Sequence, residues 1–558
     1  MYSILHKTLQ YKYIILISIT FLSYIGGLNG KFVIDDPELI EYDSFYTTET
    51  NPIKCFARSF WRKDRQQNLY RPITVLSYWI ETKIFSKFST KNSTLFQALF
   101  RVDNLLLHII TVILLLKFLE LLMFSKTTSF FSALIFAVHP IHVEAVTPAF
   151  GRAELLCSLF LLIAFIFHIK SYKHTYFSIY AGIFAFAAFL SKENGIVFLP
   201  IIIILNICFS KKLQQQNLTS KNNKFSSKSK FYLIQYSIYT SILAIVFIMH
   251  KYFLNCWLPD NKHFFAQIDN PIAMINPALR FISAIKIQGF ALSKFFYPNV
   301  LAHDYSFAQI LPCQSIFDLY AFITIICFLI VTTTFYYFYP KYRHHTLFLV
   351  LAYIISIIPA GNFIIPAGTI FAERLQYFPS IFLSSFSAIL IIQFSKKYKT
   401  NLLIYLFVLC ILALSIRTIF RTLDWYDNET LALNALKTSP KSIKTWNNIA
   451  VIFINKKQYP EALAACSESI KIYKKNTTAY ANRALAFIQL KDFKSAENDI
   501  DTALAIEKNN FYANFIKGFI LIHQKEKGKA LNLWRKLEKD FPQQQQVKTA
   551  IKSLCSDE

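Results

Sequence analysis

The stretch KYIILISITFLSYIGGLNGKFVIDDPELI, residues 12–40, decides the class of fold. Its first part, 12–28, is a nearly unbroken apolar run of the length that crosses the hydrocarbon core of a bilayer. Asp35 and Asp36 follow almost directly, where the chain leaves the membrane. Desolvation and mutual repulsion both disfavour adjacent charged carboxylates there, and such groups often serve as bases or cation ligands. The alternative is a solvated turn before Pro37.

The whole chain has the composition of a multi-pass membrane protein. Of its 558 residues, 54% are hydrophobic, 56 are Phe and only 11 are Gly, and the mean hydropathy is +0.36. We therefore expect an all-α membrane bundle of about eleven spans. The expected spans lie at 12–28, 96–116, 128–146, 153–169, 175–190, 195–209, 231–250, 315–338, 345–360, 375–394 and 401–418.

Lys and Arg clusters predict the orientation of these spans. The clusters occur in every second loop and are strongest in a Lys-rich loop at 210–230, which we expect to be disordered. We expect this loop and the N-terminus to be cytoplasmic. The first loop, 29–95, and everything after the last span then lie on the other side. Basic inside loops against anionic lipid account for much of the net charge of +26, so no nucleic-acid partner is expected.

Charged motifs gather on the extracytoplasmic face of this topology. They are Asp35–Asp36, Tyr70–Pro72, His139–Glu154, Ser191–Asn194, Asp304–Tyr305 and Glu373–Arg374. Ionisable groups at a membrane edge default to functional or paired roles, so we expect one shared polar cavity. His139 and His142 are expected to be hydrogen-bonded core groups, because nothing fixes a metal-ligand geometry. The nine cysteines show no CxxC spacing and predict no zinc site.

A 34-residue repeat begins at Trp446. Ala450, Ala484 and Gly518 share one position, and Ala462, Ala496 and Ala530 share another, as in tetratricopeptide repeats. The predicted domains are a membrane domain at 1–420, a half-repeat linker at 421–445, three repeats at 446–545 and a tail at 546–558. The repeats form an α-solenoid, which either presents a protein acceptor to the membrane domain or serves as an oligomerisation scaffold.

The motifs resemble one family. FVIDDPELI, YRPITVLSYWI, RVDNLLLHIITVILL, FAVHPIHVEAVTPAFGRAELL, LSKENGIVFLP, LAHDYSFAQILP and ERLQYFPS occur in order from residue 32 to 380. They are similar to segments of the transmembrane-and-tetratricopeptide-repeat O-mannosyltransferases, in the glycosyltransferase C superfamily. The resemblance implies inverting transfer of mannose from dolichyl-phosphate mannose to Ser or Thr hydroxyls of proteins. The repeat array is shorter than in animal members, and DYSFAQ and GTIFAERLQYFP look closer to bacterial relatives.

Such a reaction needs a base for the acceptor's proton and cations for the leaving phosphate. By resemblance to the superfamily's first-loop acidic motif, Asp35 is the base, and Asp36 assists it or holds a divalent cation. The phosphate candidates are Arg374 and Lys192, then Arg71 and Arg152, with Glu373 beside Arg374. Arg152 could equally pair with Glu154 or Glu144.

Two other classes of protein remain open. A flippase for lipid-linked sugars would also line a cavity with charges, and a membrane-anchored repeat scaffold would need no Asp35. The compartment follows the source: the endoplasmic reticulum membrane of a eukaryote or the inner membrane of a bacterium, with the N-terminus cytoplasmic and the repeats extracytoplasmic.

Overall fold

The computed structural model describes residues 9–61, 69–91, 93–217, 228–254, 268–398, 402–541 and 544–556, and within these ranges the regular structure is entirely helical. The chain divides into two compact units. The first comprises Met1–His303 and Pro312–Asn428, and the second comprises Asp304–Leu311 and Glu429–Glu558.

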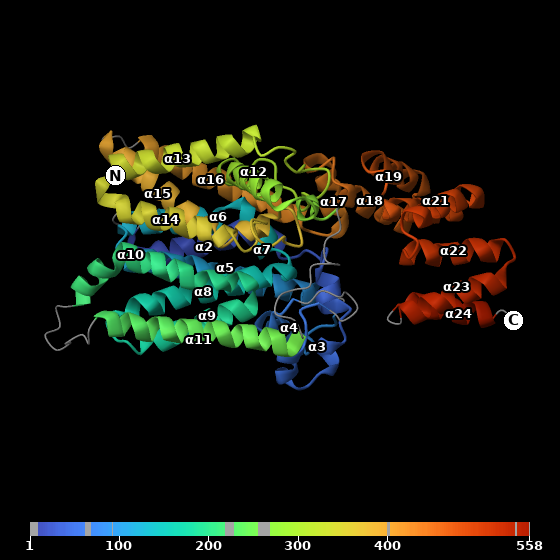
Figure 1. Cartoon of the computed structure of the whole chain (residues 1–558), viewed down its shortest axis with the longest axis horizontal. Coiled ribbons are helices and arrows are strands. Elements are labelled where there is room, and N and C mark those ends of the chain that lie inside the picture. The colour runs from blue at the N-terminus through green and yellow to red at the C-terminus, as the bar shows by residue number, and fades with distance from the viewer. Residues whose placement is uncertain are drawn as a thin grey trace. The chain divides into compact units, whose positions relative to one another are not determined.

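The first unit is a bundle of long apolar helices that run side by side (Figure 1). Each expected span overlaps one of the longer helices, and some also include a short helical turn. The helices are α2 (Lys12–Tyr24), α5 (Thr94–Leu121), α6 (Lys126–Val138), α8 (Arg152–Ser171), α9 (Phe177–Ser191), α10 (Phe198–Asn217), α11 (Lys228–Leu254), α13 (Leu319–Phe338), α14 (Arg343–Ile357), α15 (Ser380–Lys397) and α16 (Leu402–Asp424). The protein is a multi-pass membrane protein.

Fewer than eleven of these helices are long and apolar enough to count as complete spans. Among the described residues, six helices are long and apolar enough to cross a membrane, or up to seven if a bent pair counts as one span. The bent pair joins α6 to Pro140–Val146 at 52°. Pro140 causes the break because proline lacks the N–H that would continue the helical ladder. Lys12–Gly27 and Phe177–Ser191 are shorter apolar helices, so the count of eleven remains a prediction.

Short helices fill the connections at one end of the bundle, where α3 (Phe45–Thr48) and α4 (Pro72–Phe85) lie together (Figure 1). The other short elements of this unit are η1 (Ile25–Gly27), η2 (Pro37–Glu41), η3 (Pro52–Ala57), η5 (Pro140–His142), α7 (Val143–Val146), η6 (Ala149–Gly151), η7 (Glu193–Val197), η9 (Pro271–Met274), η10 (Pro340–Tyr342) and η11 (Glu373–Gln376). A longer helix, α12 (Pro277–Phe296), precedes α13.

The expected loop at 210–230 is shorter than the Lys-rich composition suggests. Helix α10 continues through Asn217 and α11 already begins at Lys228. Lys and Gln are good helix formers, so the polar stretch after the apolar run can extend α10. Residues 218–227 lie outside the described residues.

The second unit consists of paired helices in the register of the 34-residue repeat. They are α17 (Asn428–Thr438), α18 (Ile443–Asn455), α19 (Tyr459–Ile472), α20 (Thr477–Gln489), α21 (Phe493–Ile506), α22 (Phe511–His523), α23 (Lys527–Asp540) and α24 (Gln545–Ser556). The first helix of each pair has an N-cap side chain at the same repeat position, from Ser442, Asn476 and Asn510. The repeat therefore sets the caps as well as the core.

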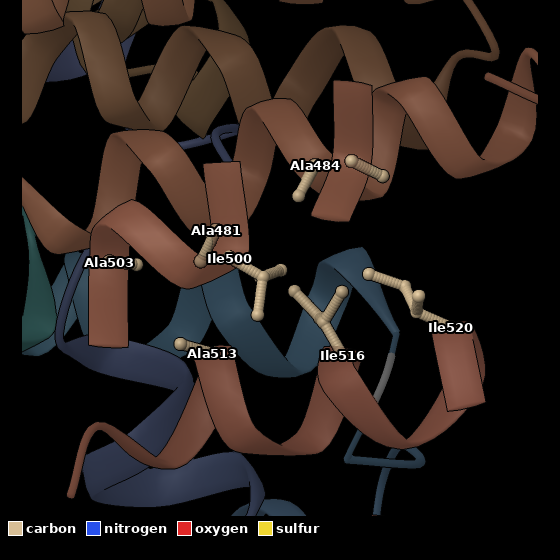
Figure 2. Packing of buried hydrophobic residues seen from close by; sticks show 8 residues of the cluster. Ala481, Ala484, Ile500, Ala503, Ala513, Ile516 and Ile520 are labelled. Atoms are coloured by element: carbon tan, nitrogen blue, oxygen red, sulfur yellow. The ribbon is translucent and has the colours of Figure 1, made fainter. Parts of the chain in front are cut away.

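Small residues let these helices approach closely. The second position that the repeats share is occupied by alanines that are fully buried in every repeat, Ala462, Ala496 and Ala530. Figure 2 shows Ile500 of α21 and Ile516 of α22 pointing toward each other within a cluster of alanines. In the last pair Gly518 leaves the room that the Trp534 indole occupies.

The end of the chain differs from the expected tail. Residues 545–556 form α24, whose Val547 and Leu554 join a core cluster with Trp534. An apolar face thus continues past the third repeat, and α24 covers it, as terminal capping helices do in repeat proteins.

Asp304 belongs to the second unit, contrary to our expectation that it shares a cavity with the other charged motifs. Its side chain accepts hydrogen bonds from Ser442 Oγ and from Ser306 Oγ, and its carbonyl accepts one from Ser439 Oγ at 2.8 Å. The neighbouring Phe307 carbonyl accepts from Ile443 N at 3.1 Å. The segment Asp304–Leu311 therefore packs against the start of α18.

Candidate active site

Three of the basic side chains that the sequence singled out, Arg374, Lys192 and Arg71, each pair with a nearby glutamate. Arg374 in η11 donates to Glu144 of α7 through Nη1 and, at 3.0 Å, through its backbone N. Lys192, between α9 and η7, donates to Glu154 in the first turn of α8. The third pair joins the N-cap of α4 to η7, where Arg71 Nε and Nη2 contact the two carboxylate oxygens of Glu193 at 2.9 and 2.6 Å.

The three pairs form one electrostatic cluster. Burial acts to lower the pKa of Arg374, but the charges of Glu144, Asp35 and Glu154 outweigh it and raise that pKa. Burial likewise opposes the charge of Arg71, while Glu193 and Glu154 raise the Arg71 pKa and the charge of Arg374 lowers it. The fold thus brings Asp35, Arg71, Lys192 and Arg374 together, although they are far apart in the sequence.

Exposure distinguishes the members of this cluster. The Glu144 and Glu154 side chains are only 1% and 4% exposed, so their cations cannot leave without stranding a buried charge. Arg374 is 28% exposed although Glu144 anchors it, so part of its guanidinium is accessible. Glu193 is 47% exposed and can turn into solvent, which would release the fork of Arg71.

The two aspartates have different environments. Asp36 is fully buried, and its two oxygens accept hydrogen bonds from Phe150 N at 2.7 Å and Val33 N at 3.2 Å. Burial raises the pKa of Asp36 to about 6, although Arg101 and the backbone donors act in the opposite direction. Asp35 is half-buried, and its charge acts on Arg374. Asp36 therefore fastens the first loop to η6, just before α8, while Asp35 lies near enough to Arg374 for its charge to act on that side chain.

Gly151 permits this fastening. A Cβ at this position would overlap the backbone carbonyl of Ala145, so only glycine allows the chain to turn from α7 into α8 here. The turn presents Phe150 N to Asp36.

Arg152 lies apart from the phosphate candidates. Its guanidinium donates to Glu81 of α4, to Asn104 Oδ1 and, at 3.1 Å, to the carbonyl of Phe100. Neither of the alternative partners, Glu154 and Glu144, pairs with Arg152, because Glu154 accepts from Lys192 and Glu144 from Arg374. Arg152 is 1% exposed, which gives it the environment of a structural ion pair.

Glu373 points away from its neighbour Arg374. It is fully buried, accepts a hydrogen bond from Ala302 N at 2.7 Å and lies 3.4 Å from Arg421 of α16. Two adjacent residues of η11 thus face different partners, Glu373 the buried Arg421 and Arg374 the Glu144 pair.

His139 and His142 are hydrogen-bonded core groups, as predicted. His139 Nε2 lies 2.8 Å from the carbonyl of Phe295, and its ring stacks on that of Phe295 at 4.5 Å. His142 bridges the carbonyl of Phe136 at 2.9 Å and Ser380 Oγ at 2.7 Å. In the described ranges, no group of three or more His, Cys, Asp or Glu residues is placed to hold a metal ion.

The sequence reasoning assigned no role to several residues around the site. Arg101 and Arg421 are nearly fully buried within apolar helices, and Glu81 accepts from Arg152. A charged residue inside an apolar run is itself a signal of a paired or functional role, and it could have identified both arginines.

Comparison with known proteins relates the chain to one group of enzymes. Protein O-mannosyl-transferase TMTC3 of Mus musculus is 27% identical over 508 residues, which cover 87% of this chain and 53% of that protein. Protein O-mannosyl-transferase F38B6.6 of Caenorhabditis elegans is 28% identical over 447 residues, which cover 79% of this chain and 59% of that protein. The chain spans about half the length of the curated relatives it matches.

Among solved structures, an oligosaccharyltransferase of Archaeoglobus fulgidus aligns with a TM-score of 0.39 and 13% identity, covering 81% of this chain and 58% of that one. The TPR2AB domain of yeast Sti1 aligns with a TM-score of 0.17 and 16% identity, covering 41% of this chain and 96% of that one. No family model matches the chain. Over most of its own length, the chain is similar to protein O-mannosyl-transferases of animals.

Proposed function

We propose that the chain is a membrane glycosyltransferase that transfers mannose from a polyprenyl phosphate, such as dolichyl phosphate, to Ser or Thr hydroxyls of protein acceptors. The observation that supports the proposal most is that the charge of Asp35 acts on Arg374, a partly exposed cation that Glu144 anchors. A carboxylate next to accessible cations is what proton removal and phosphate departure require. The names of the relatives support the choice of sugar and of acceptor class.

The proposed reaction is a single displacement. The acceptor hydroxyl oxygen attacks the anomeric carbon of the sugar and forms the new glycosidic bond. The bond between that carbon and the phosphate oxygen breaks, and the phosphate leaves with the electron pair. Asp35 takes the hydroxyl proton. One base and one leaving group require no covalent intermediate, so the anomeric configuration inverts.

The burial of the ion pairs suggests how the cations share the phosphate. Arg374 stays anchored to buried Glu144 and offers its exposed face to the leaving group. Arg71 exchanges the exposed carboxylate of Glu193 for the phosphate, because a guanidinium fork fits either anion. Lys192 is 6% exposed and stays with Glu154, so it contributes positive potential rather than a contact.

Asp36, Arg152 and Glu373 then support the site through buried contacts rather than touching the substrate. A divalent cation, where one takes part, would be held by the donor phosphate together with the Asp35 carboxylate. We also propose that the repeats recruit the protein acceptor. The inside Lys clusters, with the odd number of expected spans, support a cytoplasmic N-terminus and extracytoplasmic repeats. The membrane is that of the endoplasmic reticulum in a eukaryotic source and the inner membrane in a bacterial one.

Purified protein in detergent tests this function directly. Radiolabelled dolichyl-phosphate mannose and a Ser/Thr-rich peptide should yield a labelled peptide with an α-linkage opposite to the donor's β-linkage. A parallel reaction with chelator reports on a metal. Absence of transfer from any polyprenyl-phosphate sugar, together with movement of such lipids across sealed vesicles containing the protein, would replace the enzyme by a flippase. Inactivity in both assays would favour a scaffold.

A further inference from the structure

The loop that carries the two aspartates is held by a segment that lies nearly four hundred residues later in the chain. Lys31 N donates to the carbonyl of Tyr426 at 2.7 Å. Ile34 N donates to Asn428 Oδ1 at 2.8 Å, across a sequence separation of 394 residues. Both contacts lie within the first unit, of which Asn428 is the last residue. Two backbone amides before Asp35, those of Lys31 and Ile34, are thus paired with the end of this unit. The two between them donate elsewhere, Phe32 N to Gln97 Oε1 and Val33 N to Asp36 Oδ2, each at 3.2 Å.

A buried arginine joins the same two segments. Arg101 of α5 donates through Nη1 to the carbonyl of Gly27 at 2.8 Å. Its Nη2 donates to the carbonyls of Lys31 and, at 2.9 Å, of Trp425. A Cβ on Gly30 would overlap this guanidinium, so a larger residue there would force Arg101 to shift. Arg101 therefore fixes the base of the loop, and only its tip, from Phe32 to Asp35, is left for other contacts to set.

Ile34 sits at that tip in an unfavourable conformation. Its φ is 52°, in the left-handed region, which a β-branched side chain rarely adopts. The side chain is 37% exposed, so packing of the isoleucine alone does not explain the conformation. Asn428 Oδ1 accepts the N–H of this same residue. Since Asp35 follows directly, the conformation of Ile34 sets the direction of the Asp35 side chain.

We infer that Asn428 is a positioning residue that holds Ile34 in the left-handed conformation and thereby keeps the Asp35 carboxylate facing Arg374. The inference rests on the proposed function for its catalytic consequence. Asn428 is also the first residue of α17, the helix that leads into the repeats. Positioning of the base therefore depends on the last residue of the first unit.

The test compares Asn428→Ala with Asn428→Asp and with the control Asn509→Ala, an exposed asparagine in the turn after α21. Asn428→Ala should lower kcat by about 10- to 100-fold and leave the donor KM and the thermal midpoint unchanged, because only the base is misdirected. Asn428→Asp should retain most of kcat, since a carboxylate also accepts the Ile34 N–H. Its added charge should move the acid limb of the pH profile to higher pH.

A double-mutant cycle with Ile34→Gly identifies the route. Glycine adopts the left-handed region without a side-chain cost, so the Asn428→Ala effect should be clearly smaller in the Ile34→Gly chain. Equal effects in both backgrounds would overturn the inference, as would a kcat of Asn428→Ala equal to that of Asn509→Ala.

Hydrogen exchange separates this inference from the proposed function. In full-length protein, Asn428→Ala should speed exchange in the peptide that covers residues 31–36, whether or not the wild type transfers sugar. If the wild type is inactive with every polyprenyl-phosphate sugar, the proposed function fails, and faster exchange still supports the hold on Ile34. Unchanged exchange refutes the hold.

Discussion

The substitution Arg374→Ala should lower both the stability of the protein and its use of the sugar donor, and the two effects can be measured separately. The Arg374→Ala variant leaves Glu144 without its partner, and Glu144 is only 1% exposed. Breaking a buried pair by deleting one member costs about 3 to 5 kcal/mol, because the remaining charge is buried and uncompensated. The single variant is therefore expected to unfold at a clearly lower temperature than the wild type.

A second substitution isolates the role in donor binding. In Arg374→Ala/Glu144→Gln the buried charge is gone, so most of the lost stability should return. The contact with the donor phosphate does not return. One charge-assisted hydrogen-bonding partner is worth about 2 to 3 kcal/mol, which corresponds to roughly 30- to 150-fold in donor kcat/KM.

The assay measures transfer at varied donor and varied acceptor concentration, beside thermal unfolding in the same detergent. Glu144→Gln alone is the matched control, because it keeps Arg374. We expect the double variant to lose donor kcat/KM while the acceptor KM stays near the wild-type value. A double variant that is stable and uses the donor as well as Glu144→Gln does would show that Arg374 serves only to neutralise Glu144.

Three further outcomes are expected. Because burial raises the pKa of Asp36 to about 6, the folded chain holds this proton more tightly than the unfolded chain. The free energy of unfolding should therefore fall by up to about 3 kcal/mol as pH rises from about 4 to about 7. Thermal unfolding of wild type and Asp36→Asn checks this, and an equal dependence of stability on pH in both proteins refutes it. Gly518→Ala should destabilise the repeats by about 1 to 3 kcal/mol because its Cβ overlaps the buried Trp534, whereas Gly528→Ala, which has open space, should not; circular dichroism compares the two. Protease protection should place residue 220 in the cytoplasm and the repeats beyond Trp446 on the opposite side, and repeats digested from the cytoplasm would reverse the orientation.

Periodic features were predictable from the sequence. The apolar runs and the 34-residue spacing of Ala462, Ala496 and Ala530 are regular patterns along the chain, so the sequence displays them directly. The cluster of Asp35, Arg71, Lys192 and Arg374 was predictable as a set, because ionisable groups at a membrane edge seldom lack a partner.

The partners themselves were not predictable. Arg374 and Glu144 are 230 residues apart, and the spacing of charges along the chain does not say which pairs will meet. For Arg152 the sequence left open a phosphate contact or an ion pair within its own segment, yet α4 brings Glu81 to it. Asp304 was expected at the site, yet it accepts a hydrogen bond from Ser442, the N-cap residue of α18, because a polar motif between two helices can belong to either unit.

The most direct test of the account is the transfer rate of Asp35→Asn beside wild type, with dolichyl-phosphate mannose and a peptide acceptor in detergent. Asparagine keeps the size of Asp35 and removes the proton acceptor. Wild type should form mannosyl peptide, and the transfer rate of Asp35→Asn should be lower by roughly 10² to 10⁴, with an unchanged thermal midpoint. Full transfer by Asp35→Asn would contradict the assignment of the base.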